Sequence, residues 1–237
     1  MSVERIERRL YLDIDGTLID TKQIKKKFIG RLADFCSVTV ADIENLLNAY
    51  VELIGESTKF DPKGFAEYIS QQLLDDNKKP KFKAADLANQ LLDPANIIDT
   101  AFPDVSTLSH VVRSFFTHGL RLGVFSQGVT YWQQLKLLHS GVPYSLFEPD
   151  LEKIHPRKTD QSIVTKMPGG SVIVDDREDM LAPLAERADL HPIWINRKSQ
   201  EKSSIPGVET IHTLRDLSRL LRRLWLGEQP TKGEQSR

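Results

Sequence analysis

The chain has 237 residues, of which 40% are hydrophobic and 27% are charged, and its formal net charge is −1. This balance is typical of a globular protein with enough apolar residues for a substantial core. The near-zero charge argues against a dedicated nucleic-acid binder, which carries a clear excess of basic residues. The single cysteine, Cys36, excludes an internal disulfide and therefore a disulfide-stapled secreted scaffold.

The N-terminal segment MSVERIERRL is charged and lacks the apolar run and small-residue cleavage site of a signal peptide. No uninterrupted apolar run reaches the roughly 18 residues that a membrane-spanning helix requires. We therefore expect a cytoplasmic protein that binds neither membrane nor nucleic acid. The sequence does not indicate the oligomeric state.

The first predicted element is a short buried strand from Arg9 that ends in polar residues and a glycine turn at 13–17. The pattern then becomes helical. Four helices are expected: one capped by Thr21, one capped by Thr39, one beginning at Asp61-Pro62, and one over 84–92. Because this stretch contains no strand pattern, we predict that residues 21–100 form an inserted, all-helical cap.

From residue 102 onward, helices and strands alternate. Helices are expected at 105–116, 131–138, 178–188 and 214–226, and strands at 120–125, 171–174, 192–195 and 208–211. This alternation predicts an α/β fold, a Rossmann-like parallel sheet flanked by helices. Residues 1–20 and 101–226 are expected to form this core, and residues 227–237 a disordered tail.

Polar residues follow three of the predicted strands, and the carboxyl ends of parallel strands meet at one edge of a sheet. Crowded carboxylates repel one another unless a cation lies between them, and an all-oxygen ligand set favours Mg²⁺. A lysine and a serine at the same edge would suit phosphoryl transfer, in which positioning and charge neutralisation supply most of the catalysis. The residues concerned are Asp13, Asp15, Ser126, Lys158, Asp175 and Asp176.

Four segments, in this order, resemble the motifs of the haloacid dehalogenase-like (HAD) hydrolase superfamily and its capped phosphatase branch. They are Leu12-Asp13-Ile14-Asp15-Gly16-Thr17, Val124-Phe125-Ser126-Gln127-Gly128, Lys158-Thr159-Asp160 and Val172-Ile173-Val174-Asp175-Asp176. The first motif is specific, whereas the lysine motif is short, and Lys153 is an alternative to Lys158. The order and spacing of all four segments carry the resemblance.

The resemblance implies that Asp13 is the nucleophile, which forms an aspartyl-phosphate, and that Asp15 is the general acid and then the general base. It also implies a Mg²⁺ ion bound by Asp13, by the backbone carbonyl of Asp15, and by Asp175 or Asp176. The residues implied to bind the phosphoryl group are Gly16, Thr17, Ser126, Gln127 and Lys158.

The implied activity is Mg²⁺-dependent hydrolysis of a small phosphorylated metabolite, with the cap supplying substrate contacts. Two alternatives use the same core: a phosphomutase, which returns the phosphoryl group to the substrate, and a phosphonatase, which needs a lysine in the cap. A catalytically idle binding or regulatory protein is an alternative from another class, although acids at both 13 and 15 argue against it. Asp15 also disfavours dehalogenation, because dehalogenases of this superfamily usually lack an acid there.

Overall fold

A computed structural model describes residues 7–74 and 79–228. At its centre is a six-stranded sheet with the strand order β3-β2-β1-β4-β5-β6, in which every pair of neighbours is parallel. The strands are β1 (Arg8–Leu12), β2 (Leu120–Gln127), β3 (Glu152–His155), β4 (Val172–Asp175), β5 (His191–Ile195) and β6 (Glu209–Ile211).

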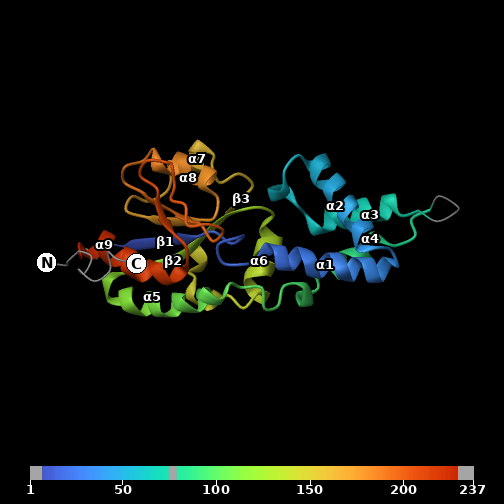
Figure 1. Cartoon of the computed structure of the whole chain (residues 1–237), viewed down its shortest axis with the longest axis horizontal. Coiled ribbons are helices and arrows are strands. Elements are labelled where there is room, and N and C mark those ends of the chain that lie inside the picture. The colour runs from blue at the N-terminus through green and yellow to red at the C-terminus, as the bar shows by residue number, and fades with distance from the viewer. Residues whose placement is uncertain (1–6, 75–78, 229–237) are drawn as a thin grey trace.

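Helices cover both faces of this sheet (Figure 1). Alternate residues of β1 belong to different cores: Leu10 and Leu12 pack with α5 (Leu108–Phe115) and α9 (Leu217–Leu226), whereas Tyr11 packs with α7 (Gln161–Val164) and α8 (Glu178–Ala185). This two-sided burial explains why residues Leu10 to Leu12 of the strand are all apolar, whereas the two arginines before them are only half-buried. The predicted Rossmann-like α/β fold is confirmed.

A group of four helices lies to one side of the sheet in Figure 1. These are α1 (Thr21–Cys36), α2 (Val40–Ile54), α3 (Pro62–Gln72) and α4 (Ala84–Leu92). Thr39 caps α2 with a reciprocal bond to Asp42, and Asp61 caps α3, as predicted. Asp20, rather than Thr21, caps α1 by accepting a hydrogen bond from the Lys22 amide. The assignment of residues 21–100 to a separate cap stays a prediction.

The structure differs from the predicted elements in four places. Strand β3 was not predicted, because its sequence Glu-Lys-Ile-His is mostly polar and its residues are only half-buried at the edge of the sheet. Short 3₁₀ helices at 103–107 and 214–216 precede α5 and α9, so both α-helices begin later than expected. Helix α8 ends at Ala185, before the predicted residue 188.

The predicted disordered tail falls, from residue 229 onward, outside the described residues. Within those residues, no helix is long and apolar enough to cross a membrane.

Arg197, just after β5, holds the loop that follows β1. Its guanidinium donates a hydrogen bond of 2.8 Å to the carbonyl oxygen of Thr17 and two bonds of 2.9 and 3.0 Å to the carboxylate of Asp104. Asp104 also accepts hydrogen bonds from the hydroxyl of Thr213 and the amide of Leu214. These charge-assisted bonds tie the loop that carries the first motif to the opposite end of the chain.

Candidate active site

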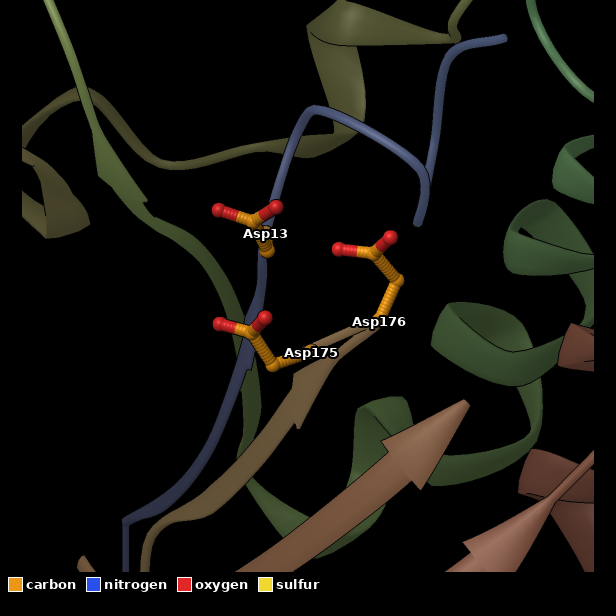
Figure 2. A group of neighbouring side chains, drawn as sticks. All are labelled: Asp13, Asp175 and Asp176. Atoms are coloured by element: carbon orange, nitrogen blue, oxygen red, sulfur yellow. The ribbon is translucent and has the colours of Figure 1, made fainter. Parts of the chain in front are cut away.

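Three carboxylates meet where two adjacent strands end (Figure 2). Asp13 directly follows β1, Asp175 is the last residue of β4, and Asp176 follows it. Leu12 pairs with Val174 across the two strands, so the next residues along each chain lie side by side. One oxygen from each carboxylate lies within 4.8 Å of the others. The register of the sheet therefore builds this cluster.

Lys158 is the cation within this cluster. It lies between β3 and α7 with only 4% of its side chain exposed, and its Nζ is 2.7 Å from Asp13 Oδ1 and also bonded to Asp175. Burial acts to lower the pKa of Lys158, but the two carboxylates outweigh burial and raise this pKa above its usual value. Lys153, the alternative, lies half-buried on β3, so the turn before α7 brings Lys158 to Asp13.

The cluster carries more negative charge than one lysine offsets. Burial, followed by repulsion from Asp175, raises the pKa of Asp176 to about 6. Burial likewise raises the pKa of Asp13 to about 7, against the opposing effect of Lys158. Carboxyl groups with raised pKa values prefer the protonated form unless a cation approaches. The site therefore has the electrostatic character of a cation-binding site.

The two acids after β4 have different surroundings. One oxygen of Asp175 bonds to Lys158, and the other accepts a hydrogen bond of 2.9 Å from the amide of Arg177. The carboxylate of Asp176 makes no hydrogen bond to any residue in the described part of the chain, and it lines the cavity of the site. Asp176 is thus the better placed of the two to accept a metal ion.

Gly16 allows the chain to pass close to Asp176. Its φ of +77° lies in the left-handed region, and a Cβ built on it would stand 2.2 Å from Asp176 Oδ2. Any side chain here would therefore be strained and would also displace the carboxylate. The glycine of the first motif is explained by this close approach.

Of the residues predicted to bind the phosphoryl group, Gly16, Gln127 and Lys158 line the cavity of the site, whereas Thr17 and Ser126 are not among its lining residues. Thr17 and Ser126 are buried, and neither hydroxyl has a hydrogen-bond partner among the residues described. Gln127 instead bridges two parts of the chain: its Nε2 donates to the hydroxyl of Thr58 at 3.0 Å, and its Oε1 accepts from the Lys158 amide at 3.4 Å. Buried hydroxyls without partners are costly, so a polar ligand for Thr17 and Ser126 is expected.

Asp15 lies apart from the three clustered carboxylates. Its side chain, 35% exposed, is bonded by two side chains of α6 (Thr130–His139), namely Gln133 and Lys136. Neither residue was predicted to belong to the site, although two polar residues on the buried face of an amphipathic helix are an unusual pattern. The predicted metal contact of the Asp15 backbone carbonyl stays a prediction.

A cavity of about 680 Å³ opens above these residues. Its floor includes Asp13, Asp15, Lys158 and Asp176, and its opposite wall comes from α1, α2 and the segment 57–60. Apolar and polar side chains contribute to this wall in nearly equal number. The wall residues are Thr21, Ile24, Lys25, Phe28, Leu47, Asn48, Val51, Glu52, Ser57, Thr58 and Phe60. The lysine of this wall is Lys25, an exposed residue of α1.

No protein-family model matches the sequence, and no curated protein matches it significantly. Several solved structures, however, are similar to it in fold. A haloacid dehalogenase-like hydrolase from Burkholderia xenovorans is 17% identical, with a TM-score of 0.63 over 92% of this chain and 98% of that one. A 2-haloacid dehalogenase from Pseudomonas syringae is 17% identical, with a TM-score of 0.60 over 92% and 99%.

A HAD-hydrolase from Bacillus subtilis, described as bound to magnesium, is 15% identical with a TM-score of 0.56 over 91% of this chain and 98% of that one. At these identities the likeness concerns the fold, and it includes the helical segment because almost all of each chain is covered. The chain has the fold of the haloacid dehalogenase-like hydrolases.

Proposed function

We propose that the protein is a Mg²⁺-dependent hydrolase of small phosphomonoesters that acts through an aspartyl-phosphate on Asp13. The observation that carries this proposal is the second acid, Asp15, which lines the same cavity as Asp13 and Lys158. An alkoxide leaving group needs a proton donor, whereas a departing halide does not. The acid therefore favours phosphoester hydrolysis over the dehalogenase reaction named for several proteins of this fold.

The residues at the site fit Mg²⁺. The donor set is entirely oxygen, it is buried, and Asp13 and Asp176 have raised pKa values that a nearby dication would reverse. Asp13 and Asp176 would bind the ion, while Asp175 orients Lys158. When bound, Mg²⁺ supplies positive charge that offsets the charge on the phosphoryl oxygens.

In the first step, a carboxylate oxygen of Asp13 forms a bond to phosphorus as the ester P–O bond breaks, and Asp15 gives its proton to the leaving oxygen. In the second step, water attacks phosphorus, Asp15 takes one proton from that water, and the bond between phosphorus and Asp13 breaks. Inorganic phosphate leaves, and both acids return to their starting states. Lys158 and the hydroxyls of Thr17 and Ser126 provide donors for the phosphoryl oxygens.

The size of the cavity suits a small substrate. A volume of about 680 Å³ is within the usual range for metabolite-sized ligands. The wall from α1 and α2 is apolar around Phe28 and Leu47, whereas Lys25, Asn48 and Glu52 place polar groups at its exposed positions. We infer that the non-phosphate part of the substrate contacts this wall, which therefore sets the specificity.

The proposal is tested by comparing three reactions of the purified protein. We expect Mg²⁺-dependent release of phosphate from an aryl phosphate and from phosphorylated metabolites, loss of this release in EDTA, and no release of halide from a 2-haloalkanoic acid. Halide release without phosphatase activity would assign the chain to the dehalogenase reaction. Transfer of the phosphoryl group back to an alcohol, rather than to water, would indicate a phosphomutase.

Mg²⁺ binding should weaken as the pH falls. The metal requires deprotonated Asp13 and Asp176, whose pKa values without metal are raised to about 7 and about 6. One proton therefore competes with the metal below pH 7 and a second below pH 6, so the apparent Kd should rise about tenfold per pH unit at first and more steeply below pH 6. Calorimetric titration with Mg²⁺ at several pH values measures this effect. A pH-independent Kd would contradict the ligand assignment, and Asp176→Asn should make the dependence shallower.

A further inference from the structure

Helix α6 places a buried lysine and a buried glutamine against the side chain of Asp15. Lys136 is 3% exposed and Gln133 is 2% exposed, and they stand one turn apart on the same face of the helix. The ammonium of Lys136 bonds to Asp15 Oδ1, and Gln133 Nε2 donates a hydrogen bond of 2.8 Å to Asp15 Oδ2. Each oxygen of this carboxyl group therefore has its own donor.

Gln133 is itself held in place by the loop after β2. Its Nε2 also donates to the carbonyl oxygen of Gln127 at 2.8 Å. The next residue, Gly128, has a φ of +143°, and a Cβ built on it would be 2.7 Å from Gln133 Nε2. The loop thus packs directly against the amide, and a side chain at position 128 would be strained at this φ and would displace the amide of Gln133.

Lys136 has one ion-pair partner within residues 7–74 and 79–228, and that partner is Asp15. A buried ammonium is costly unless it is paired, so a lysine at this position needs a specific reason. The ring of Trp132, 5.7 Å from Lys136 Nζ, adds a second favourable contact. If these side chains served only to attach α6 to the loop after β1, one of the two contacts to Asp15 would be sufficient.

We propose that Gln133 and Lys136 are positioning residues that hold the carboxyl group of Asp15 toward the oxygen of the leaving group; this inference rests on the proposed phosphatase function. Proton transfer requires the donor within hydrogen-bond reach of its acceptor, and an unrestrained aspartate rotates about two side-chain bonds. Donors on both oxygens restrict this rotation. A carboxyl group offers about four acceptor positions, so space remains for the transferred proton. All three side chains line the cavity.

The leaving group distinguishes positioning from a merely structural role. Loss of an aligned acid slows the departure of an alkoxide, but it hardly affects 4-nitrophenolate, which leaves without a proton. The measured quantity is kcat/KM of the Mg²⁺-loaded enzyme for a simple alkyl phosphate and for 4-nitrophenyl phosphate. This parameter covers only the steps through leaving-group departure, so the later role of Asp15 as a base does not enter.

We expect Lys136→Met and Gln133→Ala to lower kcat/KM for the alkyl phosphate by about tenfold to a hundredfold more than for the aryl phosphate. This loss is smaller than the whole rate acceleration of about 10²–10⁴ that a general acid typically contributes, because the acid itself is still present. Lys136→Arg should restore part of the difference. The matched control is Gln134→Ala, because Gln134 is the neighbouring glutamine on α6 and its side chain, among the residues described, bonds only to Glu152 at the surface. This control should leave the ratio of the two substrates unchanged.

A double variant separates a loss of Asp15 positioning from a general loss of protein stability. In an Asp15→Ala background, Lys136→Met should cause no further loss on the alkyl substrate, because the group that it positions is absent. Equal losses on both substrates, or additive losses in the double variant, would overturn the proposal. Gln133→Ala, which removes no charge, carries the comparison if Lys136→Met does not fold. A wild-type protein that hydrolyses neither phosphate would instead overturn the proposed function.

Discussion

Asp13→Asn should reduce phosphatase turnover by a factor on the order of 10⁴ or more, because the amide cannot form the acyl phosphate through which the reaction passes. The side chain keeps its shape, and its carbonyl oxygen can still accept a hydrogen bond from Lys158, which now lies 2.7 Å from Asp13 Oδ1. The fold should therefore persist. Steady-state hydrolysis of an aryl phosphate with Mg²⁺ measures the loss.

A control acid and a chemical trap sharpen this experiment. Asp179 is close in sequence to the metal cluster, but it is 66% exposed and pairs with Arg177, so Asp179→Asn should retain full activity. Rapid acid quench of the wild-type reaction should reveal a phosphorylated peptide containing Asp13, and this adduct should be absent from Asp13→Asn. Undiminished turnover by Asp13→Asn would exclude the nucleophile assignment.

Lys158→Met should cost the metal-free protein much of its stability. Asp13 and Asp175, which are 5% and 1% exposed, would lose their shared cation. Removing one partner of a buried ion pair typically costs about 3–5 kcal/mol. For a chain of this size, that cost corresponds to a fall in Tm on the order of 10 °C. Thermal unfolding followed by circular dichroism in EDTA measures the effect.

The size of this loss should depend on pH. The pKa of Asp13 is already raised to about 7 in the presence of Lys158, so its carboxyl is protonated at pH 5 and charged at pH 8. An acid whose pKa is raised on folding loses stability as the pH increases, so Lys158→Met should be more damaging at pH 8 than at pH 5.

Two further variants distinguish the loss of stability caused by breaking the buried ion pair from the general effect of removing a lysine. Lys153→Met, on the half-buried strand β3, should change Tm little. Asp175→Asn in the Lys158→Met background should recover part of the stability by removing one of the two stranded charges. A Lys158→Met protein as stable as wild type at pH 8 would show that this cluster is not held together by its lysine.

The local elements of this fold are strongly encoded in its sequence. The fully buried residues Leu10 to Leu12 of β1 and Val172 to Val174 of β4 are apolar because both faces of the sheet are covered there, and the acids that reach the site come directly after them. Thr39 and Asp61 mark the starts of α2 and α3 by capping their free amide groups. Strand β3 lacks such a signal, because an edge strand with half-buried polar residues is stabilised mainly by its pairing with β2.

The site was predictable to the extent that it depends on strand ends. Asp13 and Asp175 follow from the rule that parallel strands deliver their carboxyl ends to one edge, given the register between β1 and β4. Lys158 rather than Lys153 reaches the site because of the turn before α7, and no periodic pattern in the sequence predicts the path of that turn. The distinct roles of Asp175 and Asp176 likewise depend on which carboxylate Lys158 and the Arg177 amide contact.

An α/β core with acids at the ends of its strands can be predicted from the amino-acid sequence alone. Those features are local, because apolar periodicity and capping act over a few residues. By contrast, the contacts of Gln133 and Lys136 with Asp15, and the wall of the cavity that α1 and α2 form, are visible only in the folded protein. Contacts between residues more than a hundred positions apart depend on how whole elements pack, and that packing leaves no periodic trace in the sequence.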